Sequence, residues 1–168
     1  FTNYKIAVPP YPMAVIARGA VEYGLDMDAI KTRVLKWSYG VRVYSKFTIG
    51  DPPSCKTLEG RIYKFHLMAK RGIKVKVNQQ FSTTMYPIYP NQTSIIFKFF
   101  YTPKYSPQYC DEPGMLQLDE FTVDLPDTHL GLDRPVSFHL FFGSMEIIVA
   151  AKNETNGKVY HTIFNLEL

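Results

Sequence analysis

The residue types that most often carry chemistry are present in this 168-residue sequence, but their spacing does not form a recognisable catalytic centre. Four histidines are scattered along it, and no His-x-x-x-His or Cys-x-x-Cys spacing predicts a zinc site. The acidic pairs Asp111-Glu112 and Asp119-Glu120 are sequence neighbours, whose side chains point to opposite faces of a strand. No serine or cysteine lies in a Gly-x-Ser-x-Gly turn. We therefore expect no catalytic residue, no metal ligand and no enzyme activity in this chain.

Nucleotides and nucleic acids are not the ligands that this sequence favours. A phosphate cradle requires a Gly-rich loop between a strand and a helix, and none is present, so we expect no nucleotide or other cofactor here. The net charge of +4 is mild. Lysines alternate with apolar residues in 73–77, which is typical of the solvent face of a strand, where lysine opposes edge-to-edge aggregation. A nucleic-acid groove would interleave basic and stacking aromatic residues along one path.

Cysteine usage and hydropathy bear on the compartment. We expect Cys55 and Cys110, which lie far apart in the sequence, to be free thiols in a reducing compartment. No apolar run approaches the roughly 20 residues of a membrane span. No charged segment followed by an apolar one opens the chain as in a secretory signal. These features favour a cytoplasmic protein without a membrane span.

Periodicity predicts one helix followed by many strands. Apolar residues fall near one stripe over 13–23, and Gly24 follows as a typical residue after the last helical turn. The later segments alternate or run apolar at strand lengths, with turn signals such as Asn156-Gly157 between them. The predicted strands are 33–37, 40–48, 61–66, 73–83, 94–102, 117–124, 136–142, 146–152 and 158–165. This pattern predicts a mainly β fold, an antiparallel two-sheet β-sandwich, preceded by one helix from the end of a different domain.

The strand-rich part carries more apolar side chain than a sandwich needs. Residues 95–101 are largely apolar on both faces, whereas a strand of a two-sheet sandwich has one inner face to fill. The loop 86–90 adds further apolar rings. One interpretation is a buried central strand beneath a covering loop. The other is an apolar cleft, rimmed by loops, that holds an extended peptide.

Several fragments resemble one family in the same order along the chain. They are Ala14-Val-x-x-x-Gly-Ala-Val-x-x-Gly-Leu-Asp26, Tyr39-Gly-Val41, Pro113-Gly114 and Phe142-Gly-x-x-Glu-Ile147, together with Gln80-Phe-Ser-Thr83, Asn91-Gln-Thr93 and Ala151-Lys-Asn-Glu-Thr-Asn-Gly-Lys158. From about Pro9 to its end, the sequence resembles the C-terminal part of the 70-kDa heat-shock protein superfamily. The resemblance is closest to the divergent branch that contains the 12A- and 12B-like proteins.

That resemblance implies a division of labour between two parts. Residues 1–32 would be the remnant of an actin-like ATPase domain and a linker, and residues 33–168 the substrate-binding β-sandwich. Full-length relatives would bind ATP and act as chaperones in the stress response. This chain, without phosphate-binding loops and without a helical lid, would be a module that holds extended apolar peptide segments or a protein client.

The resemblance also implies where a peptide would bind, in a groove built from four strand segments with an arch across it. The matching residues are Val41, Tyr44, Phe81, Thr84, Met85, Ile95, Phe97 and Phe138. Among them Tyr44 falls on one side of the arch and Thr84 or Met85 on the other, while Ile95 falls at the central pocket. The alternative is a structural or adaptor sandwich whose groove is filled by its own 86–90 loop, and which acts through an outer surface or by self-association.

Overall fold

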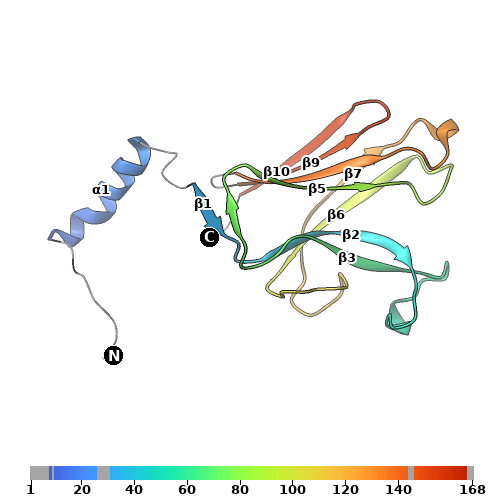
Figure 1. The fold of residues 1–168 in the computed structure, drawn as a ribbon, viewed down its shortest axis with the longest axis horizontal. Coiled ribbons are helices and arrows are strands. Elements are labelled where there is room, and N and C mark those ends of the chain that lie inside the picture. The colour runs from blue at the N-terminus through green and yellow to red at the C-terminus, as the bar shows by residue number, and fades with distance from the viewer. Residues whose placement is uncertain (1–7, 9, 26–30, 144–145, 166–168) are drawn as a thin grey trace. The chain divides into compact units, whose positions relative to one another are not determined.

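The computed structural model describes residues 8, 10–25, 31–143 and 146–165 (Figure 1). The chain divides into two compact units, residues 1–31 and residues 32–168. The described part of the first unit contains helix α1 (Pro12–Leu25), which extends the predicted helix by one residue at its start and two at its end. The assignment of residues 1–32 to the end of an ATPase domain stays a prediction.

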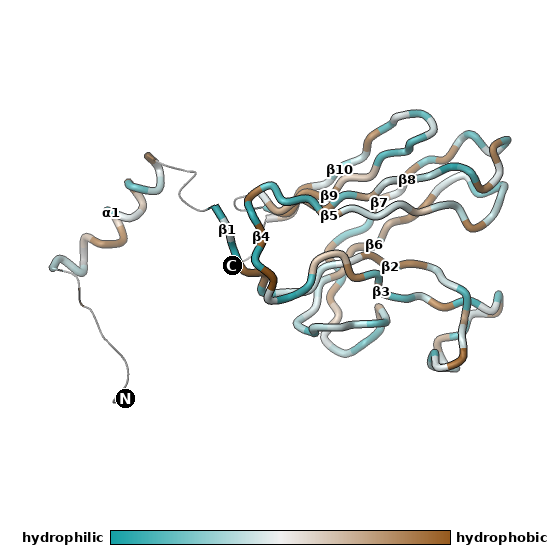
Figure 2. Tube along the Cα trace, viewed as in Figure 1, coloured by the Kyte–Doolittle hydropathy of each residue, from teal (hydrophilic) through white to brown (hydrophobic). Residues whose placement is uncertain are grey.

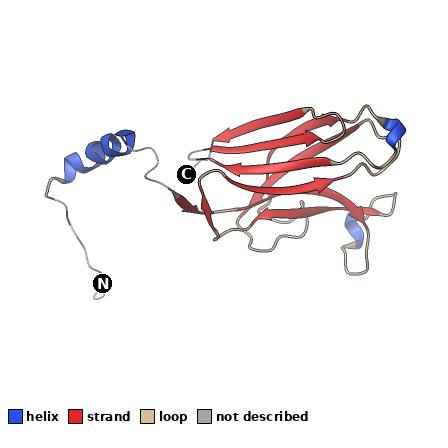
Figure 3. Ribbon diagram, turned by 45° about the horizontal axis from the view of Figure 1, so that its top comes forward, coloured by secondary structure: helices blue, strands red, loops and turns tan. Residues whose placement is uncertain are grey.

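The second unit is mainly β. Its strands are β1 (Thr32–Val34), β2 (Ser38–Lys46), β3 (Arg61–Ala69), β4 (Lys74–Lys76), β5 (Gln79–Met85), β6 (Ser94–Thr102), β7 (Leu116–Asp124), β8 (Val136–Phe142), β9 (Glu146–Asn153) and β10 (Val159–Asn165). Short 3-10 helices, Pro53–Cys55 and Thr128–Leu130, lie in the connecting loops (Figure 3). All strand pairs in the described residues are antiparallel, so the prediction of a mainly β chain with antiparallel sheets is confirmed.

Two four-stranded sheets face each other in the described part of this unit. Their strand orders are β10-β9-β8-β5 and β3-β2-β6-β7, and a small β1-β4 pair completes the topology. In Figure 1, β9 and β10 lie in the upper layer and β2 and β3 in the lower one. Phe97 and Phe99 of β6 stack on Phe138 of β8, with ring centroids 5.0 and 5.1 Å apart. The core therefore lies between the two layers.

Alternation explains why these segments form half-buried strands. Buried residues alternate with partly exposed ones along the whole of β8 and β9, so that one face of each strand enters the core.

The hairpin between β9 and β10 turns through the polar segment 154–158, and its tip is hydrophilic in Figure 2. Gly157 there has a φ of 74°, a left-handed conformation that glycine adopts without a steric penalty.

One predicted strand is two strands in the structure. The segment 73–83 breaks into β4 and β5 around Asn78, which has a φ of 61°. Asparagine tolerates this left-handed conformation better than most residues. The break lets β4 pair with β1 while β5 pairs with β8 in the main sheet.

The β3-β2-β6-β7 sheet splits into two hairpins. Strands β2 and β6 share only the pairs from Ser38↔Thr102 to Val41↔Phe99 in the described chain. Beyond this point β2 continues to pair with β3, and β6 continues to pair with β7. In Figure 1 the β2–β3 hairpin turns away from β6. We call this point of separation the fork.

Irregular pairing on both sides of the sheet coincides with the fork. The β2–β3 register shifts between Tyr39 and Gly40, and the β6–β7 register shifts between Phe99 and Phe100. Such bulges bend a strand and increase its twist, so they direct the two hairpins apart. A Cβ atom on Gly40 would overlap the His66 carbonyl oxygen and lie 2.6 Å from the Phe65 ring. Glycine is therefore required where β2 begins to leave the sheet.

Candidate functional site

The fork opens into a pocket of about 450 Å³, which we call the fork pocket. Its walls come from β2, β3, the end of β5, the following loop and β6. The lining residues are Arg42, Val43, Tyr44, Tyr63, Thr84, Met85, Tyr86, Ile88, Gln92, Ser94, Ile95 and Ile96. Most of these are apolar or aromatic, so the pocket suits an apolar side chain surrounded by a few polar groups.

Two strand edges border the fork pocket. Residues 42–46 of β2 and 94–98 of β6 have strand partners on their outer sides, β3 and β7, but none on the sides that face the fork in the described chain. In an antiparallel ladder the backbone N–H and C=O groups of a strand alternate between its two neighbours. Each edge therefore presents backbone donors and acceptors toward the fork. Such edges are templates for an additional extended chain.

A stack of four side chains stands on the β2–β3 hairpin beside the pocket. Tyr44 and Tyr63 are register partners whose rings stack with centroids 4.7 Å apart. The Arg42 guanidinium lies 4.3 Å from the Tyr63 ring, and the Arg61 guanidinium lies 5.5 Å from the Tyr44 ring. We call this set the Arg-Tyr-Tyr-Arg stack. Cation–π contact of this kind holds a guanidinium flat against a ring and restricts its motion.

One carboxylate ties the two loops near the pocket to each other. Glu59, in the β2–β3 loop, accepts hydrogen bonds through Oε2 from the Tyr44 hydroxyl (2.9 Å) and the Tyr89 hydroxyl (2.6 Å). The hydrogen bonds from Tyr89 and Tyr44 lower the pKa of Glu59, and the bond to Glu59 raises the pKa of Tyr89. This contact, which we call the Glu59 latch, joins β2 and the β2–β3 loop to the 86–93 loop.

A buried arginine fixes the 86–93 loop from below. Arg134 has no exposed surface and uses all five of its N–H donors on backbone carbonyl oxygens. Three acceptors, those of Tyr89, Pro90 and Gln92, belong to the loop that contributes Ile88 and Gln92 to the pocket. The remaining two are the carbonyl oxygens of Leu125 and Gly131, at 3.0 and 2.8 Å. Arg134 therefore joins the pocket loop to the β7–β8 connection.

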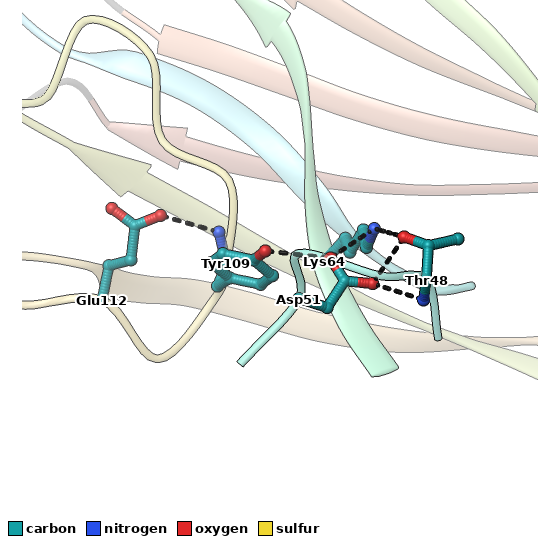
Figure 4. Close-up of polar contacts among 5 residues, drawn as sticks. All are labelled: Thr48, Asp51, Lys64, Tyr109 and Glu112. Atoms are coloured by element: carbon teal, nitrogen blue, oxygen red, sulfur yellow. Dashed lines mark hydrogen bonds and ion pairs between the residues drawn. The ribbon is translucent and has the colours of Figure 1, made fainter. Parts of the chain in front are cut away.

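Among the described residues, the acidic side chain most shielded from solvent, Asp51, has a structural role. Asp51 is 7% exposed and accepts hydrogen bonds from Thr48 N (2.8 Å), Thr48 Oγ1 (2.9 Å) and the Tyr109 hydroxyl (2.9 Å), as Figure 4 shows. Lys64 forms an ion pair with it at 2.7 Å. The hydrogen bond from Lys64, followed by that from the Thr48 backbone, holds the pKa of Asp51 well below its usual range. Asp51 thus anchors the β2–β3 loop in its charged form.

The acidic pair Asp111-Glu112 also serves the packing of a loop. Glu112 accepts hydrogen bonds from the backbone N–H groups of Gln108 (2.6 Å) and Tyr109 (2.8 Å), and it pairs with Lys104 at 2.7 Å. Figure 4 shows Glu112 and Asp51 reaching Tyr109 from opposite sides. These contacts hold the 103–115 loop against the β2–β3 hairpin.

Four of the residues predicted from sequence line the fork pocket. They are Tyr44, Thr84, Met85 and Ile95. Tyr44 comes from β2, Thr84 and Met85 end β5, and Ile95 lies near the start of β6. The structure therefore brings together the residues that the resemblance places on the arch and at the central pocket.

The other four predicted residues are not brought to the pocket. Val41, Phe97 and Phe138 are at most 1% exposed and lie in the core, because they occupy positions that face the opposite sheet. Phe81 is half-buried and packs edge-on against Phe142, with ring centroids 5.8 Å apart. These residues belong to or pack against the hydrophobic core and do not line the pocket.

Several functional candidates were missed by the sequence. Arg42, Tyr63 and Ile96 line the pocket from strand positions whose alternation was visible, but the fork that exposes them was not. Glu59 and Arg134 hold the 86–93 loop through contacts to residues 30 to 45 positions away, for which the sequence contains no local signal.

Both cysteines are free thiols and line a second cavity of about 280 Å³, together with Arg42, Tyr63, Phe100 and Asp111. The Cys55 thiol donates to Asp111 at 3.1 Å, and this hydrogen bond raises the pKa of Cys55. Burial raises the pKa of Cys110 to about 12. Since the thiolate is the reactive form, neither cysteine is activated as a nucleophile.

The described residues offer neither a metal site nor a membrane-spanning helix. No group of three or more His, Cys, Asp or Glu side chains among them could hold a metal ion. No helix in the described ranges is both long and apolar enough to cross a membrane.

Fold and site together define a class: a mainly β domain of two facing antiparallel sheets, with an apolar pocket bordered by two open strand edges. The chain is similar to proteins named heat shock 70 kDa protein 12A. It is 25% identical to the mouse protein over 162 residues, which cover 92% of this chain and 24% of the relative. It is 24% identical to the human protein over 155 residues, covering 88% of this chain and 23% of the relative.

These similarities confirm the predicted resemblance to a 12A-like 70-kDa heat-shock protein as a distant relationship. The chain spans about a quarter of the length of the curated relatives it matches. It matches no protein-family model.

Proposed function

We propose that residues 32–168 bind an extended apolar segment of another polypeptide in the fork pocket, as a chaperone-like module. The observation that carries this proposal is the split of the β3-β2-β6-β7 sheet, which leaves two strand edges bordering an apolar pocket of about 450 Å³. The distant relationship to heat shock 70 kDa protein 12A supports the same conclusion.

The pocket offers two kinds of interaction to such a segment. The open edges of β2 and β6 can exchange backbone hydrogen bonds with an extended chain, which gives affinity without sequence preference. Ile95, Ile96 and Met85 can bury one apolar side chain, which contributes about 1.5–3 kcal/mol for a leucine or isoleucine. Because association also costs translational and side-chain freedom, we expect dissociation constants of roughly micromolar or weaker.

In this proposal the module itself is neither an enzyme nor a cofactor-binding protein. The resemblance assigns helix α1 to the end of an actin-like ATPase domain, and coupling to ATP would be a property of the longer protein. The large apolar side chains that α1 exposes, such as Ile16 and Leu25, fit a helix that packs on further protein. A cytoplasmic location and a role in the stress response belong to the same proposal.

Peptide binding by variants of the pocket tests the proposal. We would measure fluorescence anisotropy of a labelled leucine-rich peptide with the whole chain and with Ile95→Lys and Ile96→Lys. Ile96 is 54% exposed, so its replacement preserves the core even if that of Ile95 does not. Ile163→Lys, at a residue 59% exposed on β10 and outside the pocket, is the matched control.

We expect both pocket variants to bind at least about 10-fold more weakly, because a charge replaces the apolar wall, and the control to bind like the unchanged protein. Unchanged binding by a folded Ile96→Lys variant would refute the assignment of the pocket.

The second candidate is an adaptor sandwich whose groove is filled by its own loop. The observation that favours it is that Tyr86 and Ile88 of the 86–93 loop line the pocket, so a movement of this loop could fill it. Such a protein would act through an outer surface or by self-association. A molecular mass in solution above that of one chain, together with the absence of peptide binding, would select this candidate.

A further inference from the structure

The charge in the fork pocket is one-sided. Among the described residues that line it, Arg42 is the one charged residue, and no carboxylate lines it. Arg61, at the other end of the Arg-Tyr-Tyr-Arg stack, lies near the Glu59 carboxylate, which opposes its charge. A ligand in the pocket therefore meets a positive charge at Arg42 beside an apolar surface.

The Arg42 guanidinium is held in place but has no polar partner. It lies over the Tyr63 ring at 4.3 Å, and the described part of the chain gives it neither a hydrogen bond nor an ion pair. Arg134 in contrast uses five backbone acceptors, and Arg71 donates to the Pro103 carbonyl oxygen at 2.7 Å. A guanidinium stacked on a ring keeps its N–H edge available, and that edge matches a carboxylate in two parallel hydrogen bonds.

The carboxylates around Arg42 are already engaged. Glu120 forms its ion pair with Lys98 at 2.6 Å, and Lys98 first, with Arg42 a smaller cause, lowers the pKa of Glu120. Asp111 accepts the hydrogen bond of the Cys55 thiol, and Glu59 accepts those of two tyrosines in the Glu59 latch. No carboxylate of the described residues forms an ion pair with Arg42, so a ligand can supply an acceptor in place of water.

We propose that the fork pocket selects extended segments in which a carboxylate accompanies the apolar side chain, and that Arg42 is the residue that binds this carboxylate. The inference rests on the proposed function, because it specifies which segments the pocket takes. The carboxylate belongs to an aspartate or glutamate beside the apolar residue, because a segment that pairs with the open strand edges continues through the pocket. Lysine at the same place would be repelled by Arg42.

Binding of matched peptides to the whole chain tests this selection. Three labelled peptides share a leucine centre and an amidated C-terminus, and are flanked on both sides by aspartate, asparagine or lysine. A fourth has asparagine flanks and a free C-terminal carboxylate directly after the leucines. We expect the aspartate peptide to bind about 3- to 10-fold more tightly than the asparagine peptide, and the lysine peptide more weakly still. Tighter binding of the fourth peptide than of the aspartate peptide would overturn the assignment to an aspartate or glutamate side chain.

Two variants assign the effect to Arg42. In Arg42→Gln the aspartate and asparagine peptides should bind equally, because the ion pair that distinguishes them is lost. Arg71→Gln, which removes an arginine outside the pocket, should preserve the preference. Without any variant, the preference of the unchanged protein for aspartate should shrink as salt rises from about 0.05 M to about 0.5 M, because exposed charges are screened.

The outcomes separate this inference from the proposed function. Equal binding of the aspartate, asparagine and free-carboxylate peptides would overturn the inference while the peptide-binding function stands. A preference that persists in Arg42→Gln would overturn the role of Arg42. If no peptide binds at all, the proposed function fails and this inference fails with it.

Discussion

Replacing Arg134 with methionine should loosen the pocket loop and destabilise the second unit. Methionine keeps much of the aliphatic volume of the side chain but provides none of the five N–H donors that reach carbonyl oxygens of the 86–93 loop and the β7–β8 connection. A buried carbonyl oxygen that loses its partner cannot recover one from water unless the structure opens.

The size of the effect follows from where the five acceptors lie. The bond to Leu125 is fully buried, and its carbonyl left without a partner costs about 1–3 kcal/mol. The four others involve groups that solvent partly reaches, so each lost bond costs about 0.5–1 kcal/mol. Relief of the desolvation of the guanidinium offsets part of this, and we expect a net loss of about 3–5 kcal/mol. That is a large share of the ~5–15 kcal/mol by which domains are usually stable.

Urea unfolding followed by circular dichroism measures this loss, and peptide anisotropy on the same samples measures the pocket. The control is Arg71→Met, because the Arg71 side chain donates one hydrogen bond, to the Pro103 carbonyl oxygen, and lies over Tyr105 at 5.2 Å in a partly exposed position. We expect this control to lose less than about 1 kcal/mol. Equal, small losses for the two variants would show that Arg134 does not hold the loop, and the account of the pocket wall would then be wrong.

Three further predictions concern the loops and the fork. The lowered pKa of Asp51 means that its charge stabilises the folded state above the unfolded pKa of about 4, and that this contribution is lost as pH falls through the folded pKa. The difference in melting temperature between the unchanged protein and Asp51→Asn should therefore be constant from about pH 7 to about pH 5 and shrink below about pH 4. Tyr89→Phe removes one bond of the Glu59 latch, so a bound peptide should dissociate about threefold faster in stopped-flow displacement. Gly40→Ala should cost about 1–3 kcal/mol in urea unfolding, because its Cβ has no room beside the His66 carbonyl oxygen.

Each of these has an outcome that contradicts it. A melting difference for Asp51→Asn that stays constant into acid would mean that the carboxylate is not stabilised by its partners. An unchanged dissociation rate for Tyr89→Phe would show that the latch does not limit release. A Gly40→Ala protein as stable as the unchanged one would mean that the fork relaxes freely.

The sequence predicted the strands well because their pattern is local. Alternation in 136–142 and 146–152, with Asn156-Gly157 after them, leaves few alternatives to a meander. The break at Asn78 was missed because the apolar residues on both sides of it fall at odd-numbered positions, as in one continuous strand, although the polar run 78–80 interrupts the alternation and the backbone turns there. The strand register across the fork could not be predicted from the sequence either, because it depends on two bulges in different hairpins.

The candidate site was predicted in part, and the prediction rested on the family resemblance more than on the physical pattern of the residues. Tyr44 and Ile95 were named through a resemblance, and the structure places both at the pocket. Val41 and Phe97 satisfy the same apolar pattern but face the core. Apolar character alone therefore does not distinguish a residue that lines the pocket from a residue of the core. Arg42 and Arg134 could not be assigned, because the role of an arginine depends on which acceptors the folded chain leaves for it.

The fork also determines how the lower sheet can bend. Its two hairpins are each complete on their own, and four rungs are all that join them within the described chain. Thermal bending should therefore concentrate along this single seam, leaving the ladders on either side intact. A small rotation of one hairpin could then accommodate bound segments whose side chains differ in size. The stacked phenylalanine rings of the core would be little disturbed. The ability to bind many different segments would then follow from the bending of the sheet, and the side chains that line the pocket would not have to change.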